Sequence, residues 1–124
     1  MSFRIDRLPE YFSLTMTGVL TAEDLQLMAV RAAQMEDAEP VILPRLIDMT
    51  EVESVTVGFA EVLALATQRR TRQYANPFKC AFLVGTEVQK GYARMYQTLN
   101  DNPQFRVKIF HSRPEAAEWL KLPL

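Results

Sequence analysis

The sequence predicts an α/β protein in which four helices flank a five-stranded mixed sheet, in the order β-β-α-β-α-β-α-β-α. The last third of the chain gives the clearest observation. Two short apolar runs, residues 78–84 and 105–110, alternate with two helix-like segments, residues 87–99 and 112–120. Strands that alternate with helices at this spacing form a parallel sheet with helices packed on it. A second observation, an N-terminal hairpin pattern, adds an antiparallel portion.

The hairpin is predicted from two stretches that alternate apolar and polar residues. Phe3 and Ile5 begin the first stretch, and residues 11–16 form the second. Leu8-Pro9-Glu10 between them is a turn candidate. Gly18 is expected either to end the second strand or to produce a bulge in it.

The first helix is expected to begin after Thr21. Asp24 lies three residues further on, which is a variant of the capping box. At the other end, the acidic residues 36–39 oppose the helix dipole, and Pro40 prevents continuation of the helix. The predicted buried face consists of Leu25, Met28, Ala29, Ala32 and Met35.

The central part of the chain predicts a third strand over residues 41–49, although Pro44 favours a start at the following residue or a bulge. Glu51 and Glu53 are expected in a polar loop. A second helix is predicted over residues 57–74, with a narrow face of small residues that suits close packing on a sheet. This face consists of Ala60, Leu63, Ala64, Thr67 and Thr71.

The composition is that of an ordinary globular protein, with 48% hydrophobic and 23% charged residues, and it predicts one domain over residues 1–124. The net charge of -1 argues against a nucleic-acid partner. A lone cysteine, Cys80, indicates a cytoplasmic protein, and no apolar run reaches the roughly 18–20 residues of a transmembrane segment. The predicted core comprises Ile5, Leu14, Leu25, Met28, Leu46, Ile47, Leu63, Cys80, Phe82, Val84, Met95, Leu99, Val107, Ile109 and Trp119.

Five segments in a fixed order carry a family resemblance: residues 18–24, 46–49, 91–96, 107–110 and 115–120. Together they resemble the STAS domain, named after sulfate transporters and anti-sigma factor antagonists. The resemblance is to the SpoIIAA-like bacterial branch of anti-sigma factor antagonists, which is also compared with lipid-binding CRAL-TRIO domains. It implies the element order given above and a non-enzymatic regulatory role.

One departure from this family concerns its phosphorylation motif. Regulated antagonists carry Asp-Ser-Ser/Thr-Gly after the third strand. Here Asp48 matches the aspartate and Thr50 falls where the modified hydroxyl would lie, but no glycine follows. Thr50 and Ser54 are the candidates for phosphorylation that the resemblance implies, with Thr56 the third choice.

A candidate ligand or partner surface lies where the parallel strands end, because ligands of such sheets bind at the carboxyl ends of the strands. His111 there either binds an anion or shuttles protons, or it is a loop residue without a role. Thr86 and Ser112 are predicted helix caps, each with Gln or Glu three residues later, and an exposed helix N-terminus is also an anion site. The residues of this surface are Asp48, Met49, Thr50, Thr86, His111 and Ser112.

Three function classes compete. The first is a regulatory module that binds another protein, with a homodimer as one form. The second is a carrier of a lipid or of a small apolar or anionic ligand, with an adaptable apolar pocket between the sheet and a helix. The residues expected to line this pocket are Met16, Met28, Met35, Met49 and Met95. An enzyme ranks last, because one histidine, one cysteine and no motif predict no catalytic site, metal or cofactor. The basic run of residues 69–72 either contacts phosphate or an acidic partner, or simply interacts with a helix dipole.

Overall fold

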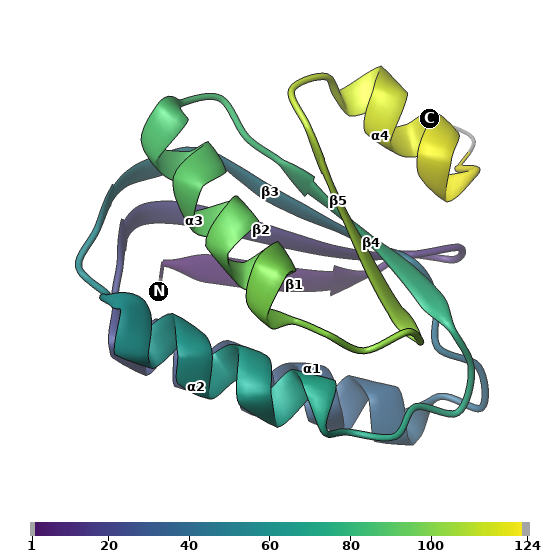
Figure 1. Ribbon diagram of the computed structural model, residues 1–124. Helices are drawn as coiled ribbons and strands as arrows, with labels where there is room; N and C mark the ends of the chain where they lie inside the picture. The colour runs from purple at the N-terminus through teal and green to yellow at the C-terminus, as the bar shows by residue number, and fades with distance from the viewer. Residues whose placement is uncertain (1, 123–124) are drawn as a thin grey trace.

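The computed structural model describes residues 2–122 and confirms the predicted fold class (Figure 1). Its five strands lie in the order β1-β2-β3-β4-β5. β1 is antiparallel to β2, and the remaining neighbours are parallel. The strands are β1 (Phe3–Arg7), β2 (Phe12–Leu20), β3 (Arg45–Val55), β4 (Phe78–Leu83) and β5 (Phe105–Phe110).

Four helices cover the two faces of the sheet unequally. The larger apolar core lies between one face and the first three helices, whereas α4 packs on the other face through a smaller cluster that includes Leu46, Ala81 and Phe110. Figure 1 shows α4 apart from the other helices. The helices are α1 (Ala22–Ala38), α2 (Phe59–Arg70), α3 (Glu87–Leu99) and α4 (Arg113–Leu120).

Local capping signals are correct in three helices. Thr21 and Asp24 form the predicted capping box, in which each side chain accepts a hydrogen bond from the other's backbone N–H. Thr86 begins α3 in the same way. Ser112 caps α4 by accepting from the backbone N–H of Glu115 at 3.4 Å, without the reciprocal bond of a full box. The residues at which these three helices begin are therefore determined by hydrogen bonds between groups three positions apart in the sequence.

The predicted core positions lie in or against the observed core except Leu63, which is half-buried and belongs to neither apolar cluster, because α2 turns Val62 and Ala66 inward instead. Those on β3 and β4 are buried, and Leu46 and Cys80 have no exposed surface. Several strand and helix positions at the margin, such as Ile5 and Val107, are half-buried and pack against the larger cluster. Apolar burial on this scale is the main favourable term that holds the sheet and helices together.

β3 is longer than predicted, and the expected loop containing Glu51 and Glu53 is wrong. The strand continues to Val55 because β2 also continues beyond Gly18 and pairs with it, Leu20 opposite Val55. The pairing of β2 with β3 shifts register twice, and at each shift β3 has one residue more than β2. This end of β3 is therefore bulged. Gly18, with φ of +66°, lies at the second shift.

The second helix is shorter than predicted, and its buried face is different. It begins after Gly58 and ends at Arg70. Val62, Ala66 and Arg69 are buried, whereas Ala60, Ala64 and Thr71 of the expected small-residue face are exposed. The prediction took Arg69 as a cation of the helix end or of a partner contact, whereas its side chain turns inward to an ion pair with Glu36 and sets the buried face of α2.

Candidate functional site

β4 and β5 end side by side at the level of Asp48 in β3, as predicted, whereas β3 itself continues beyond that point to Val55. Asp48 pairs in register with Leu83, and Leu83 pairs with Phe110. Thr86 and His111 follow directly after these aligned strand ends. We call this edge, with Asp48, Thr50, Thr86, His111 and Ser112, the carboxyl rim. Cys80 and Phe105 lie toward the opposite edge, as the register requires.

Asp48 organises the rim and is itself buried. Its Oδ1 accepts hydrogen bonds from the backbone N–H of Thr50 at 2.9 Å and from Thr50 Oγ1 at 2.6 Å. Its Oδ2 accepts from Arg113 Nη2 at 2.7 Å. The carboxylate thus supports the first bulge of β3 and ties it to the start of α4, a contact that spacing along the sequence could not indicate.

Gln89 joins the rim to the bulged end of β3, and its side chain is almost completely buried. Its Oε1 accepts from the backbone N–H groups of Gly85 and Thr86 at 2.7 and 3.1 Å. Its Nε2 donates to the carbonyl of Val52 at 2.9 Å and to that of Thr50 at 3.4 Å. An anion bound at the start of α3 would need the backbone N–H groups of Gly85 and Thr86. Both groups already donate to Gln89.

The remaining rim residues differ in accessibility. His111 and Thr50 are exposed, and Ser112 is half-buried. Met49 is buried and belongs to the larger core cluster rather than to the surface. Ser54, the other predicted phosphorylation site, is exposed on β3 opposite Val19.

Exposed apolar side chains occur near this end of the sheet. Phe59, the first residue of α2, is 57% exposed, and Val88 in the first turn of α3 is 61% exposed. Both helices begin where a parallel strand ends, so these side chains share the rim's end of the molecule. Large exposed apolar groups of this kind are frequent at interaction surfaces.

An apolar cavity of about 100 Å³ lies between the sheet and the first three helices. Met16, Met28 and Met49 line it, together with aliphatic and aromatic side chains, whereas Met35 and Met95, which were also expected there, do not. Its volume is below the roughly 300 Å³ that a drug-sized ligand needs. Two of the lining residues are charged: Arg45 and Arg69.

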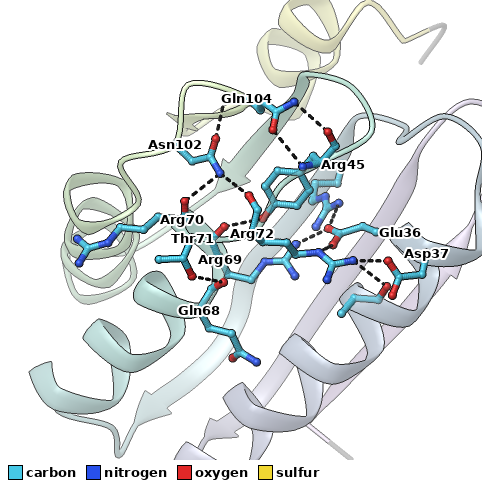
Figure 2. A network of polar contacts seen from close by, with 12 residues as sticks. Glu36, Asp37, Arg45, Gln68, Arg69, Arg70, Thr71, Arg72, Asn102 and Gln104 are labelled. Carbon is cyan, nitrogen blue, oxygen red and sulfur yellow. Dashed lines mark hydrogen bonds and ion pairs between the residues drawn. The ribbon is translucent and has the colours of Figure 1, made fainter.

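A buried ion cluster lies at these two arginines (Figure 2). Glu36 of α1 is 4% exposed. Its Oε2 accepts from both Arg45 Nη2, at 2.7 Å, and Arg69 Nη2, and its Oε1 accepts from Arg72 Nε at 3.0 Å. Arg72 also binds the exposed Asp37 at 2.6 Å. We call Glu36, Arg45, Arg69 and Arg72 the arginine cluster.

Charge is not balanced inside this cluster. Three guanidinium groups meet the carboxylate of Glu36 and the peripheral one of Asp37, which leaves one positive charge in excess. Aromatic rings compensate in part, because the Arg45 guanidinium lies 4.4 Å from the Phe78 ring centroid and 5.4 Å from that of Phe105. Arg45 Nε is nevertheless buried without a hydrogen-bond partner.

Burial changes the acidity of the groups around the cluster. Burial acts to lower the pKa of Arg69, but the nearby Glu36 carboxylate outweighs it and raises that pKa above its ordinary value. Burial raises the pKa of Tyr74 to about 12 and that of the Cys80 thiol to about 12. Cys80 is therefore a buried hydrophobe rather than a nucleophile at neutral pH.

Sequence reasoning missed the arginine cluster. It assigned residues 69–72 to a helix dipole or a partner, and it noted only that the acidic residues 36–39 oppose the dipole of the first helix. One signal was present: Glu36 lies at the helix end that disfavours acids, which indicates that another group stabilises its charge. Among residues 2–122, no group of three or more His, Cys, Asp or Glu side chains is arranged to hold a metal ion.

Comparison with known proteins defines the class of fold. No protein-family model matches the sequence, and no curated protein matches it. A solved structure is similar: an uncharacterized protein of the DUF3478 family with a SpoIIAA-like fold from Shewanella loihica PV-4. The two chains share 21% sequence identity at a TM-score of 0.62, over 95% of this chain and 91% of the other. This chain has a SpoIIAA-like fold of the STAS type.

In the described part of the chain, no helix has the length and apolar character needed to cross a bilayer.

Proposed function

We propose that this chain is a non-enzymatic module of STAS type that binds another protein through the carboxyl rim and the adjoining ends of β3, α2 and α3. The exposure of Phe59 carries the proposal, since an aromatic side chain at the start of a helix gains most from burial against a partner. The SpoIIAA-like fold supports the same class of function.

The charge around Phe59 indicates what kind of partner fits. Glu51 and Glu53 are exposed on the bulged end of β3, and Glu61 and Glu87 are exposed in the first turns of α2 and α3. The one arginine at the start of α4 is already paired with Asp48. A partner with an apolar pocket bordered by basic side chains would complement this surface.

Substitution of Phe59 by serine tests the proposal. After a partner is identified by cross-linking and purified, the Phe59→Ser variant should bind it at least about tenfold more weakly, because an aromatic anchor at the centre of an interface is lost. Leu27→Ser, which alters an exposed apolar residue of α1, is the matched control. Equal dissociation constants for the two variants would contradict the proposal. Native mass spectrometry distinguishes a second copy of this chain from a different partner.

Phosphorylation at Thr50 or Ser54 would regulate this surface. A phosphate on Thr50 would remove its hydrogen bond to Asp48 and add nearly two negative charges beside that carboxylate. Thr50→Asp and Ser54→Asp variants are expected to change partner affinity, while Thr50→Ala and Ser54→Ala retain it, in titrations with the purified partner. If Asp and Ala variants bind alike, the hydroxyls are turn residues only.

A second candidate function, the binding of a small ligand, is favoured by the apolar cavity and its three methionines. A volume of about 100 Å³ accommodates a few heavy atoms rather than a lipid chain. This function is compatible with the first, because α2 and α3 both line the cavity and the first turns of both belong to the proposed partner surface. Titration with small apolar compounds tests it.

A further inference from the structure

We propose that the apolar cavity binds a short-chain aliphatic monocarboxylate, whose carboxylate pairs with Arg45 and Arg69 and whose tail occupies the space among the methionines. This inference rests on the second proposed function and specifies its ligand. It follows from the unusual placement of two guanidinium groups in the wall of an otherwise apolar cavity.

The first step of the argument is charge. Arg45 and Arg69 both direct Nη2 at the same oxygen of Glu36, and Arg72 takes the other oxygen. Glu36 thus pairs with three guanidinium groups, of which those of Arg45 and Arg69 are buried, and the second carboxylate, that of Asp37, reaches only Arg72 at the surface. A buried charge that lacks a full complement of partners is costly, so a further carboxylate entering this region would be stabilised.

The second step is the unused hydrogen-bonding capacity of Arg45. This side chain is 8% exposed and lines the cavity. Its Nε has no hydrogen-bond partner among the described residues, although almost all buried polar atoms in proteins have one. A guanidinium matches a carboxylate in geometry, and bonds between charged partners are stronger than neutral ones.

The third step is size and shape. The wall away from the arginines is aliphatic and aromatic, including Met16, Met28 and Phe82. An apolar cavity of about 150 Å³ holds a benzene molecule, which has six carbons, so about 100 Å³ suits a tail of about four carbons, with the carboxylate itself lying among the arginines. Methionines can adjust their rotamers around a branched tail. Isovalerate, a branched five-carbon acid, is therefore the probe.

The experiment is a titration of ¹⁵N-labelled protein with isovalerate, followed by NMR. Saturable shifts are expected at amides that line the cavity, on β2, β3, α1 and α3. Isovaleramide, which has nearly the same shape without the charge, should bind at least about tenfold more weakly. Acetate, which has the charge without the tail, should not saturate over the same concentration range.

Variants test the assigned arginines. Arg45→Met and Arg69→Met, which retain much of the apolar volume, should each weaken isovalerate binding at least about tenfold. Arg70→Met, an exposed neighbour on the same helix, is the matched control and should bind as the parent does. Ala32→Leu, at a half-buried position in the cavity wall, should block the tail while leaving the arginines in place. Ala32→Leu also tests the inference if Arg45→Met and Arg69→Met fail to fold.

The outcomes separate the inference from the function on which it rests. If the amide binds as tightly as the acid, or if Arg45→Met and Arg69→Met retain full affinity, the carboxylate assignment is overturned while ligand binding in the cavity stands. If neither isovalerate nor isovaleramide gives saturable shifts at the backbone amides that line the cavity, the carboxylate assignment and the proposed ligand binding in the cavity are both overturned. Shifts confined to surface residues also count against the inference.

Discussion

Replacing Glu36 with alanine is expected to lower the free energy of unfolding by about 3–5 kcal/mol, as for other buried charge pairs that lose one partner. The Glu36 side chain is 1% exposed, and it bonds three arginines. Its removal leaves Arg45 and Arg69 buried with aromatic rings as their main compensation. The cost therefore comes from uncompensated guanidinium groups more than from the lost contacts.

Urea unfolding monitored by circular dichroism measures this effect, and an unchanged m-value would show that the variant remains two-state. Glu39→Ala is the matched control, because Glu39 pairs with Arg7 in an ion pair at the surface. This control should leave the unfolding midpoint almost unchanged, since water and salt screen such pairs. A loss below about 1 kcal/mol for Glu36→Ala would mean that the arginine cluster does not hold α1 to the sheet.

Replacing Gln89 with alanine is expected to cost about 2–4 kcal/mol, the second largest effect that we anticipate. The substitution leaves the carbonyl of Val52, which the side chain covers, and the amides of Gly85 and Thr86 without their partner. Each buried polar group left unpaired costs about 1–3 kcal/mol, and solvent can reach some of these groups after truncation.

Gln97 provides an internal control for this prediction, because it is a glutamine two turns later on the same helix. Its Nε2 donates to the carbonyl of Val107, but the contact is exposed, so Gln97→Ala should cost at most about 1 kcal/mol. Hydrogen exchange adds a local measurement: amides of residues 50–55 should exchange faster in Gln89→Ala only. Similar effects of the two variants on stability and on exchange would show that Gln89 does not anchor the end of β3.

Patterns that act over a few residues were sufficient for most of the fold. Alternation placed β1 and the first part of β2, short apolar runs placed β4 and β5, helical spacing placed α1 and α3, and Thr21 and Thr86 marked helix starts through caps that span three residues. The shared edge of Asp48, Thr86 and His111 was also predictable, because parallel strands end at the same edge whatever their exact register. The carboxyl rim as a location therefore required no tertiary information.

The tertiary structure decided which polar residues are buried and with which partners. Glu36 is joined to Arg69 and Arg72 across 33 and 36 positions of the chain, and Asp48 to Arg113 across 65. β3 extends to Val55 only because β2 lies beside it to receive its hydrogen bonds. The sequence by itself determined the order of elements and the edge at which the strands end, since these depend on local periodicity and capping. Only the fold determined the arginine cluster, the anchoring role of Gln89 and the cavity, because the free energy of a buried charge depends on partners that the chain brings together from a distance.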